Sequence, residues 1–421
     1  MIDTPPRPDP AAPDEALMEA TARAACAYFT RFAHPETGMA RERSTGAFGY
    51  DTAHTVATGG TGFGLMAILS AMHRGWIARG DGERLIARIA DFLAQADRFD
   101  GVWPHFIDAR TARTIPFSKK DDGGDLVETG LLAMGLVAAR EALAPSPLAE
   151  RLDALLAGID WAAHHRPADA PGGEGLMWHR SPRHEWDGTS LPITGWNEAL
   201  GTWVLAAGSA THPIEPGLYH RGWARGGAIV NGQVFHGVRL PVGPDKGGPM
   251  FLSQYPFLGL DPAGLVDPYA DYAEQTRAHT AINRAHCLEN PHGHAGYGAD
   301  LWGLTASDDP DGYAAHEPYH DNGTISPTAA VASIPYAPEW GLAALRGFVA
   351  REELWGPFGL GDAFNDGRGW VAPATLAIDQ GPIAVMIENH RSGLLWSLCM
   401  GAREVRAGLK ALGFRSPRLT A

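Results

Sequence analysis

The sequence predicts an all-α protein in which paired helices close into a ring, the (α/α)6 barrel. Apolar residues recur at helical spacing in about eleven or twelve segments of the 421-residue chain, close to the number that six helix pairs require. The segments between them are long and rich in Gly, Trp, His and Asp. We therefore expect long loops and a small β-hairpin around one cleft.

The first helices are predicted by spacing and by the residues that begin them. The segment 126–137 is apolar nearly all round, which predicts a buried helix. Ser146-Pro147 has the form of an N-cap followed by proline at the first helical position. Helices are expected over roughly 17–32, 61–76, 85–93, 126–137 and 147–159.

The C-terminal half repeats these start signals. Asp267-Pro268 predicts a helix that reaches about Cys287, and Ser326-Pro327 predicts another start. Further helices are expected from near Asn197, Pro338 and Pro382.

The hairpin is predicted over residues 228–235. Asn231-Gly232 lies between apolar residues there, and this dipeptide favours a tight two-residue turn.

Charge and composition exclude several function classes. Lys plus Arg number 34 and Asp plus Glu number 48, so the formal charge is −14. Nucleic acids and anionic membrane surfaces select clustered basic residues, so neither is expected as a partner. Three widely spaced cysteines cannot form a fully paired disulfide framework and fit a reducing compartment. No apolar stretch is long enough to predict a transmembrane helix.

The predicted organisation is a single domain. Residues 1–13 are rich in Pro and Ala and predict a flexible leader. Residues 14–421 show no change of composition that would mark a linker. Because the first residues lack the basic and apolar regions of a secretory signal, we expect a cytoplasmic protein.

A cluster of carboxyl groups is the first indication of catalysis. Gly123-Gly124 places Asp125 near a helix start, where the helix dipole stabilises a carboxylate. Glu128 lies on the same face inside an apolar run, where burial should raise its pKa. Asp121 precedes both. Helix capping by Asp125 together with a satisfied core glutamate explains the same pattern equally well.

A second carboxyl group, Glu198, follows Trp196 and Asn197 at the start of another predicted helix. Asp379 lies near the start of a later helix, where it could simply be a cap. Glycoside hydrolysis needs two carboxyl groups on opposite sides of the scissile bond, one protonated and one ionised. The separate acidic groups could supply that pair, and the 13 tryptophans suit stacking against sugar rings.

Other chemistries are weaker matches. The Gly60–Gly64 run has the spacing GxGxG and follows no apolar strand, so it does not predict a dinucleotide site. His292-Gly293-His294 and His164-His165 lack the spacing and partner ligands of a zinc site. We therefore expect neither a cofactor nor a metal.

Three rival functions stay open. Asp121-Asp122-x-x-Asp125 spells the aspartate-rich motif of Mg²⁺-dependent all-α terpene synthases and prenyltransferases, although Gly123-Gly124 disfavours the helix that this motif needs. A sugar epimerase on the same barrel would use paired histidines as acid and base. A non-catalytic sugar-binding protein would need no catalytic pair.

Several stretches match a known family in order and spacing. They include Ile193-Thr194-Gly195-Trp196-Asn197-Glu198 and the ranges 58–64, 209–214, 297–308, 322–330, 354–359, 362–365, 378–383 and 393–396. In these stretches the chain resembles the bacterial glucoamylase-like proteins that include the endo-β-1,2-glucanases of glycoside hydrolase family 144. It also resembles the related region of cyclic β-1,2-glucan synthases.

The resemblance implies an (α/α)6 barrel that hydrolyses β-glucan oligosaccharides, most simply β-1,2-linked ones, with inversion. It makes Glu198 the general acid. For the base it gives Asp125 first, then Asp121, with Asp379 as a further choice, and Glu128 completes the acidic set. Ser253 stands where the family has a histidine. The expected sugar contacts are Trp103, His105, Trp196, Asn197, Gln254, Tyr255, Trp302, Asp308, Asp379 and Gln380.

Overall fold

The chain folds into a ring of helices in the computed structural model, which describes residues 5–45, 51–119, 121–168, 174–184 and 191–420. The helices are α1 (Asp14–Arg31), α2 (Thr58–His73), α3 (Arg79–Leu93), α4 (Leu126–Leu143), α5 (Pro147–Ala157), α6 (Leu200–Gly208), α7 (Tyr272–Glu289), α8 (Pro327–Val331), α9 (Pro338–Ala350), α10 (Ala377–Ser392), α11 (Leu394–Gly401), α12 (Arg403–Ala411) and α13 (Pro417–Thr420).

The described strands are short and lie in the connections between helices. They are β1 (Thr55–Ala57), β2 (Phe106–Asp108), β3 (Arg113–Ile115), β4 (Gly124–Asp125), β5 (His165–Arg166), β6 (Gly175–Leu176), β7 (His179–Arg180), β8 (Val234–Phe235), β9 (Val238–Arg239), β10 (Ala306–Asp309), β11 (Gly312–Ala315), β12 (Trp355–Gly356), β13 (Gly359–Leu360), β14 (Phe364–Asn365) and β15 (Trp370–Val371). Among the described residues, only β1, β2 and β3 form a sheet of more than two strands. The all-α prediction is confirmed.

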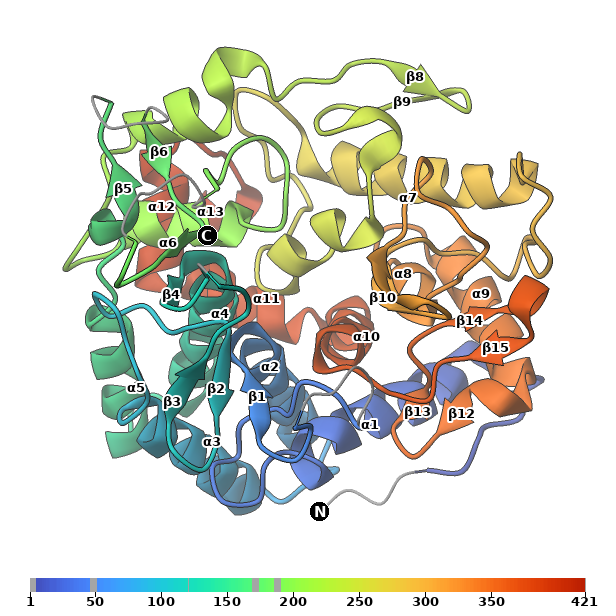
Figure 1. The fold of residues 1–421 in the computed structure, drawn as a ribbon, viewed down its shortest axis with the longest axis horizontal. Helices are drawn as coiled ribbons and strands as arrows, with labels where there is room; N and C mark the ends of the chain where they lie inside the picture. The colour runs from blue at the N-terminus through green and yellow to red at the C-terminus, as the bar shows by residue number, and fades with distance from the viewer. Residues whose placement is uncertain (1–4, 46–50, 120, 169–173, 185–190, 421) are drawn as a thin grey trace.

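The two halves of the chain close the ring by direct helix packing. Figure 1 shows α10, in red, beside α1 and α2, in blue, and α10 contacts both of these helices. α2 in turn packs against α4, and α4 packs against α5, α6 and α11. Helices far apart in the sequence therefore share one interior.

Glycine makes the tightest of these contacts possible. A Cβ on Gly62 of α2 would lie 2.3 Å from the carbonyl oxygen of Leu131 in α4, and a Cβ on Gly135 would lie 2.2 Å from the carbonyl oxygen of Gly62. The two backbones approach so closely that neither position has room for a side chain. In agreement with the predicted buried helix, α4 is enclosed along most of its length.

The predicted helix starts are confirmed in part. Ser146 caps α5 by accepting from the N–H of Ala149, with Pro147 in the first turn. The start predicted at Asp267-Pro268 is wrong, because α7 begins at Tyr272 and is capped by Asp271. Asp267 instead accepts the N–H groups of Tyr269 and Ala270 in the preceding turn.

Two later signals have different outcomes from those expected. Ser326 precedes α8, but this helix has only five residues and the Ser326 hydroxyl donates to the carbonyl of Asp362 instead of capping it. The hairpin exists as β8 and β9, yet its turn is His236-Gly237, and both residues have positive φ. Asn231-Gly232 lies before the strands, so the predicted turn is wrong.

The N-terminal segment expected as a leader lies partly against α9. Arg7 donates to the carbonyl of Val349 at 2.9 Å, and Arg346 donates to the carbonyls of Pro10 and Ala12. Among the described helices, none has the length and apolar character needed to cross a bilayer.

Candidate active site

A cavity of about 310 Å³ opens where the first turns of four helices converge. Ala57 and Glu128 line it from the starts of α2 and α4, Glu198 from just before α6, and Leu376 and Ile378 from the start of α10. The N-terminal end of a helix carries partial positive charge. The fold therefore directs four such ends towards one space that also holds carboxyl groups.

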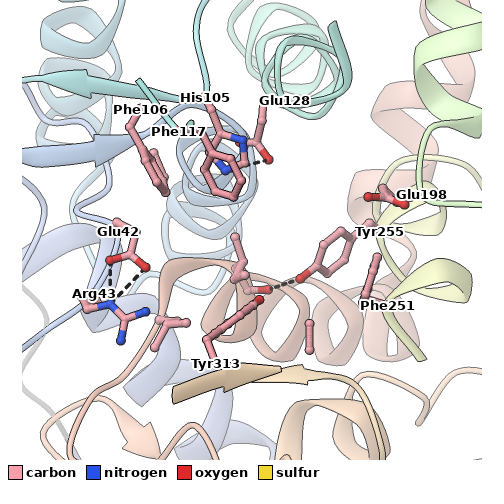
Figure 2. Close-up of a pocket in the computed structure, with 14 residues that line it drawn as sticks. Glu42, Arg43, His105, Phe106, Phe117, Glu128, Glu198, Phe251, Tyr255 and Tyr313 are labelled. Carbon is pink, nitrogen blue, oxygen red and sulfur yellow. Dashed lines mark hydrogen bonds and ion pairs between the residues drawn. The ribbon is translucent and has the colours of Figure 1, made fainter. Parts of the chain in front are cut away.

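The remaining walls come from loops, short strands and two 3-10 helices, Met250–Ser253 and Tyr255–Leu258 (Figure 2). They are Glu42, Arg43, His105, Phe106, Phe117, Phe251, Tyr255, Ala306 and Tyr313. A second cavity of about 710 Å³ shares His105 and Phe117 with the first and is lined further by Asp121, Asp125, Trp178, His179 and Leu191. The two cavities adjoin at His105 and Phe117, so the site is longer than either cavity alone.

Asp125 is placed by the start of α4. Its Oδ1 accepts the N–H groups of Val127 and Glu128, which makes it the N-cap of α4. Its Oδ2 lies 3.1 Å from Nδ1 of His105. Both oxygens are occupied and the side chain is almost fully buried, so Asp125 holds His105 in place.

His105 connects the carboxyl groups. Its Nε2 lies 3.9 Å from Oε1 of Glu128, and Phe117 stacks on its ring at 4.4 Å between centroids. Burial lowers the pKa of His105, but the Glu128 and Asp125 carboxylates outweigh that effect and raise it to about 9. The imidazole is therefore a cation at neutral pH.

Glu128 is held from two sides. The N–H of Gly59 donates to Oε2 at 2.7 Å, and His105 faces Oε1 (Figure 2). Burial raises the pKa of Glu128, while His105 and the Gly59 N–H act in the opposite direction.

Glu198 faces the same cavity from another wall (Figure 2). It precedes α6 rather than lying in its first turn, because α6 begins at Leu200 and Asn197 Oδ1 accepts the N–H of Ala199. Burial raises the pKa of Glu198 to about 7, and the charges of Glu128 and Asp125 act in the same direction. A substantial fraction of Glu198 is consequently protonated at neutral pH.

Asp121 lines the second cavity, near Asp125. Burial and the Asp125 charge raise its pKa to about 6. The aspartate-rich motif is not helical, since α4 begins only at Leu126, and Asp122 pairs with Arg183 instead of joining Asp121. This arrangement does not match the helical motif of prenyl diphosphate enzymes.

A second acidic group lies behind the opposite wall. Arg43 lines the cavity and binds both Glu42 and Asp308, with Nη1 2.9 Å from Asp308 Oδ1. Asp379 and Asp362 form a buried carboxyl pair beside Asp308, and burial with mutual repulsion raises the pKa of Asp379 well above its ordinary value. Asp379 is buried and lies outside the set of residues that line the two cavities.

Many of the predicted sugar contacts lie in the core. Gln254 donates to the Ala329 carbonyl, Gln380 donates to the Leu360 carbonyl, and the Trp103 indole donates to the Leu93 carbonyl. Trp196 and Trp302 are buried as well. Of the predicted contacts, His105 and Tyr255 line the first cavity, and Asp308 reaches it through Arg43.

The departure at Ser253 also falls outside the cavity. Ser253 is fully buried, and its hydroxyl lies 2.8 Å from Nδ1 of His279. This substitution changes the layer behind Phe251 and Tyr255 rather than the wall itself.

Sequence reasoning missed Glu42, Arg43, Phe106, Phe117, Phe251 and Tyr313. Phe251 had a usable signal in the sequence, because it lies four residues before the predicted contact Tyr255. In the structure the two rings are 5.3 Å apart. Tyr313 and Phe117 had none, since each comes from a β-hairpin or loop without a recognisable motif.

His105, Asp121 and Asp125 are the described residues that could hold a metal ion, with one ligand atom from each within 4.8 Å of the others. Their geometry fits poorly, because Asp125 is already committed to the α4 N-cap and to His105. A cation would also have to displace the proton that keeps His105 charged.

Comparison with known proteins gives the family. The Glycoamylase family model, described as "Putative glucoamylase", matches residues 190–403. The chain belongs to this family. A model for a protein of unknown function, DUF3131, matches residues 20–133.

Solved structures of family relatives agree closely with the fold. The endo-β-1,2-glucanase from Chitinophaga pinensis, in complex with sophorotriose and glucose, is 42% identical, with a TM-score of 0.93 over 97% of this chain and 100% of that one. A putative glucoamylase from Bacteroides uniformis is 45% identical, with a TM-score of 0.91 over 97% of this chain and 99% of its own. The predicted (α/α)6 barrel is confirmed.

A third relative is longer than this chain. The exo β-1,2-glucooligosaccharide sophorohydrolase (non-reducing end) from Parabacteroides distasonis is 38% identical over 95% of this chain. The chain spans 58% of the length of that relative.

Proposed function

We propose that this protein is a glycoside hydrolase that cleaves β-1,2-linked glucooligosaccharides with inversion. The observation that carries the proposal is the placement of Glu128 and Glu198 on two walls of one cavity (Figure 2). The linkage is suggested by the relatives, which are named as enzymes acting on β-1,2-glucan and its oligosaccharides. The cavity volume of about 310 Å³ suits a short sugar segment.

Glu198 is the general acid in this proposal. A pKa of about 7 leaves it protonated below neutral pH, so it can donate a proton to the departing glycosidic oxygen. Burial disfavours the ionised carboxylate, which is why a fraction of Glu198 still carries a proton to donate at neutral pH.

The acidic group across the cavity activates water. Glu128 is our choice within the set of Asp121, Asp125 and Glu128, because it shares the cavity with Glu198. His105 and the Gly59 N–H favour its ionised form. In inverting enzymes the two carboxyl groups are roughly 6.5–9.5 Å apart, which leaves room for the water that attacks from the opposite face.

Aromatic side chains supply the sugar-binding surface. Phe251, Tyr255 and Tyr313 present rings to the cavity, while Glu42 and Arg43 offer charged hydrogen-bonding partners for sugar hydroxyls (Figure 2). The second cavity, with Trp178 and Leu191, would take a neighbouring part of the chain.

The test is incubation with β-1,2-, β-1,3-, β-1,4- and α-linked oligosaccharides, followed by chromatography of the products. We expect new reducing ends from the β-1,2-linked series. Proton NMR of the first turnovers should show the α-anomer, because inversion converts a β-linkage into an α-hemiacetal. Initial release of the β-anomer would contradict inversion.

The same experiment separates the rival functions. Epimerised sugar without cleavage would identify an isomerase, and saturable binding without new reducing ends would identify a binding protein. Either result would overturn the proposed hydrolysis.

A further inference from the structure

α2 begins without a capping side chain of its own. Its N-cap residue is Ala57, and its first turn contains no acidic residue. The first N–H groups of a helix have no partners within the helix and must find them elsewhere. One partner comes from another helix, since the N–H of Gly59 donates to Oε2 of Glu128 at 2.7 Å. Glu128 thus acts as a cap for α2 while it belongs to α4.

Only glycine leaves room for this contact. A Cβ at position 59 would lie 2.7 Å from Oε2 of Glu128 and 3.1 Å from its Cδ. It would also lie 3.0 Å from Cδ1 of Leu131. Leu131 has a flexible end that can turn away, so the atoms that obstruct a side chain here belong mainly to the Glu128 carboxylate.

The segment that carries His105 is bound to the same helix start. The N–H of Thr58 donates to the carbonyl of His105 at 3.1 Å, and the Thr58 hydroxyl donates to the carbonyl of Pro104. The N–H of Asp125 donates to the carbonyl of Trp103 at 2.9 Å. The starts of α2 and α4 and residues 103–105 therefore form one rigid frame.

We propose that Gly59 is a positioning residue, whose backbone N–H, together with His105, fixes the Glu128 carboxylate in the orientation needed for cleavage. The inference rests on the proposed function, in which Glu128 acts on the attacking water. It gives the glycine-rich start of α2 a role that its spacing does not reveal. The N–H supplies a fixed hydrogen bond and a helix end supplies favourable charge for an anion.

A kinetic double-mutant cycle tests the role in catalysis. Gly59→Ala should lower kcat by about 100-fold, the scale expected for a reacting group displaced by about 1 Å, with a smaller change in KM. In a Glu128→Gln background, Gly59→Ala should lower the residual kcat by less than about threefold, because residues that act together are not additive. Equal losses in both backgrounds, or wild-type kcat for Gly59→Ala, would overturn the proposal.

A stability cycle tests the contact without using activity. Gly59→Ala should lower Tm, and Glu128→Ala should restore most of that loss in the double variant, since it removes the atoms that the new Cβ meets. Rescue is also expected if Gly59→Ala alone fails to fold. If Glu128→Ala does not restore the Tm lost in Gly59→Ala, the proposed contact is contradicted. If it does restore the Tm but the wild-type protein cleaves no β-1,2-linked sugar, only the proposed function is rejected.

Gly64→Ala is the matched control in the same helix. Its Cβ would lie 2.7 Å from Cδ1 of Phe29, an equally short contact but far from the carboxyl groups. Its loss of Tm should be the same with and without Glu128→Ala. Rescue of Gly64→Ala by Glu128→Ala would mean that the cycle measures general loosening, and would also overturn the inference.

Discussion

At the scale of single residues, Glu128 and Glu198 differ in their partners. Glu128 accepts from a backbone N–H and faces the His105 imidazolium, both of which favour its charge. Burial is the largest influence on both carboxyl groups and raises both pKa values, but for Glu198 no cationic side chain opposes it. Environments that separate the pKa values of two carboxyl groups are what an acid and a base require.

Glu198→Gln should lower kcat by about 10²–10⁴-fold, because the amide is isosteric but cannot donate a proton as an acid. The fold should be unchanged, since Glu198 makes no ion pair within the described residues. Steady-state kinetics on β-1,2-glucooligosaccharides measures the loss, and circular dichroism checks the fold. Turnover close to that of the wild type would exclude Glu198 as the acid.

The pH dependence of kcat/KM should be bell-shaped. Glu198 must be protonated, so activity should fall as pH rises through about 7. Glu128 must be ionised to activate water, and burial together with the charges of Asp125 and Asp121 raises its pKa, so activity should also fall at lower pH as Glu128 takes up a proton. In Asp121→Asn the acidic limb should move, while the alkaline limb stays near 7. A change in the alkaline limb alone would contradict this assignment.

The same raised pKa has a consequence for stability. The pKa of Glu198 is about 7 in the folded protein and 4.5 ordinarily, so ionisation of Glu198 favours the unfolded chain between these pH values and above. The wild-type protein should therefore lose stability as pH rises through that window. This loss should be smaller in Glu198→Gln.

At the scale of elements, α10 contains a proline that shapes the cavity. Pro382 lies inside the helix and has no N–H to bond with the carbonyl of Ile378 four residues earlier. That carbonyl instead accepts from the Tyr255 hydroxyl at 3.2 Å (Figure 2). The hydrogen bond that Pro382 cannot make thus leaves the Ile378 carbonyl available to hold the Tyr255 side chain in the cavity wall.

Pro382→Ala should restore an N–H that competes with Tyr255 for the Ile378 carbonyl. Loss of one hydrogen bond, worth about 0.5–1.5 kcal/mol, should raise KM by up to about tenfold without lowering Tm. Tyr255→Phe removes the hydroxyl itself and should produce a similar KM, with little further change in the double variant. Additive effects on KM would show that Pro382 acts through other contacts.

The contact between α2 and α4 should tolerate little added volume. In Gly62→Ala the new Cβ would meet the backbone of Leu131 and Leu132, which cannot turn away. We expect a loss of about 1–3 kcal/mol or more in the free energy of unfolding. Gly80→Ala is the control, because the nearest atom is Nη1 of Arg84 at 3.5 Å. It should be neutral or stabilising by up to about 1 kcal/mol, and equal effects on denaturation would contradict the argument.

The sequence predicted those parts of the fold that depend on residues close together in the chain. The Ser146-Pro147 start and the buried segment 126–137 follow from residues that lie next to one another in the chain. The cavity wall was predicted poorly because its aromatic side chains come from segments that are far apart in the chain and share no motif. Tryptophan was a misleading guide, since Trp103 and Trp302 fill the core, where their large apolar surface is best buried.

At the scale of the whole molecule, the ring brings four helix starts and their carboxyl groups to one end. Glu128 and Glu198 are 70 residues apart in the chain, yet one lies in the first turn of α4 and the other just before the start of α6. Short connections between helices could not supply walls of this depth. The long loops that predicted a cleft are the segments that carry Arg43, Phe117 and Tyr313.

This convergence also bears on whether the reaction needs a metal. Four positive helix ends and the His105 imidazolium already offset the charge of the acidic group, which is the electrostatic task that a divalent cation performs elsewhere. We expect kcat/KM to change by less than about twofold after dialysis against EDTA. Zinc should act as an inhibitor at His105, Asp121 and Asp125, because binding there would displace the proton of His105. Loss of activity in EDTA that Mg²⁺, Ca²⁺ or Zn²⁺ restores would show that the helix ends are insufficient and that the acidic group is a metal site.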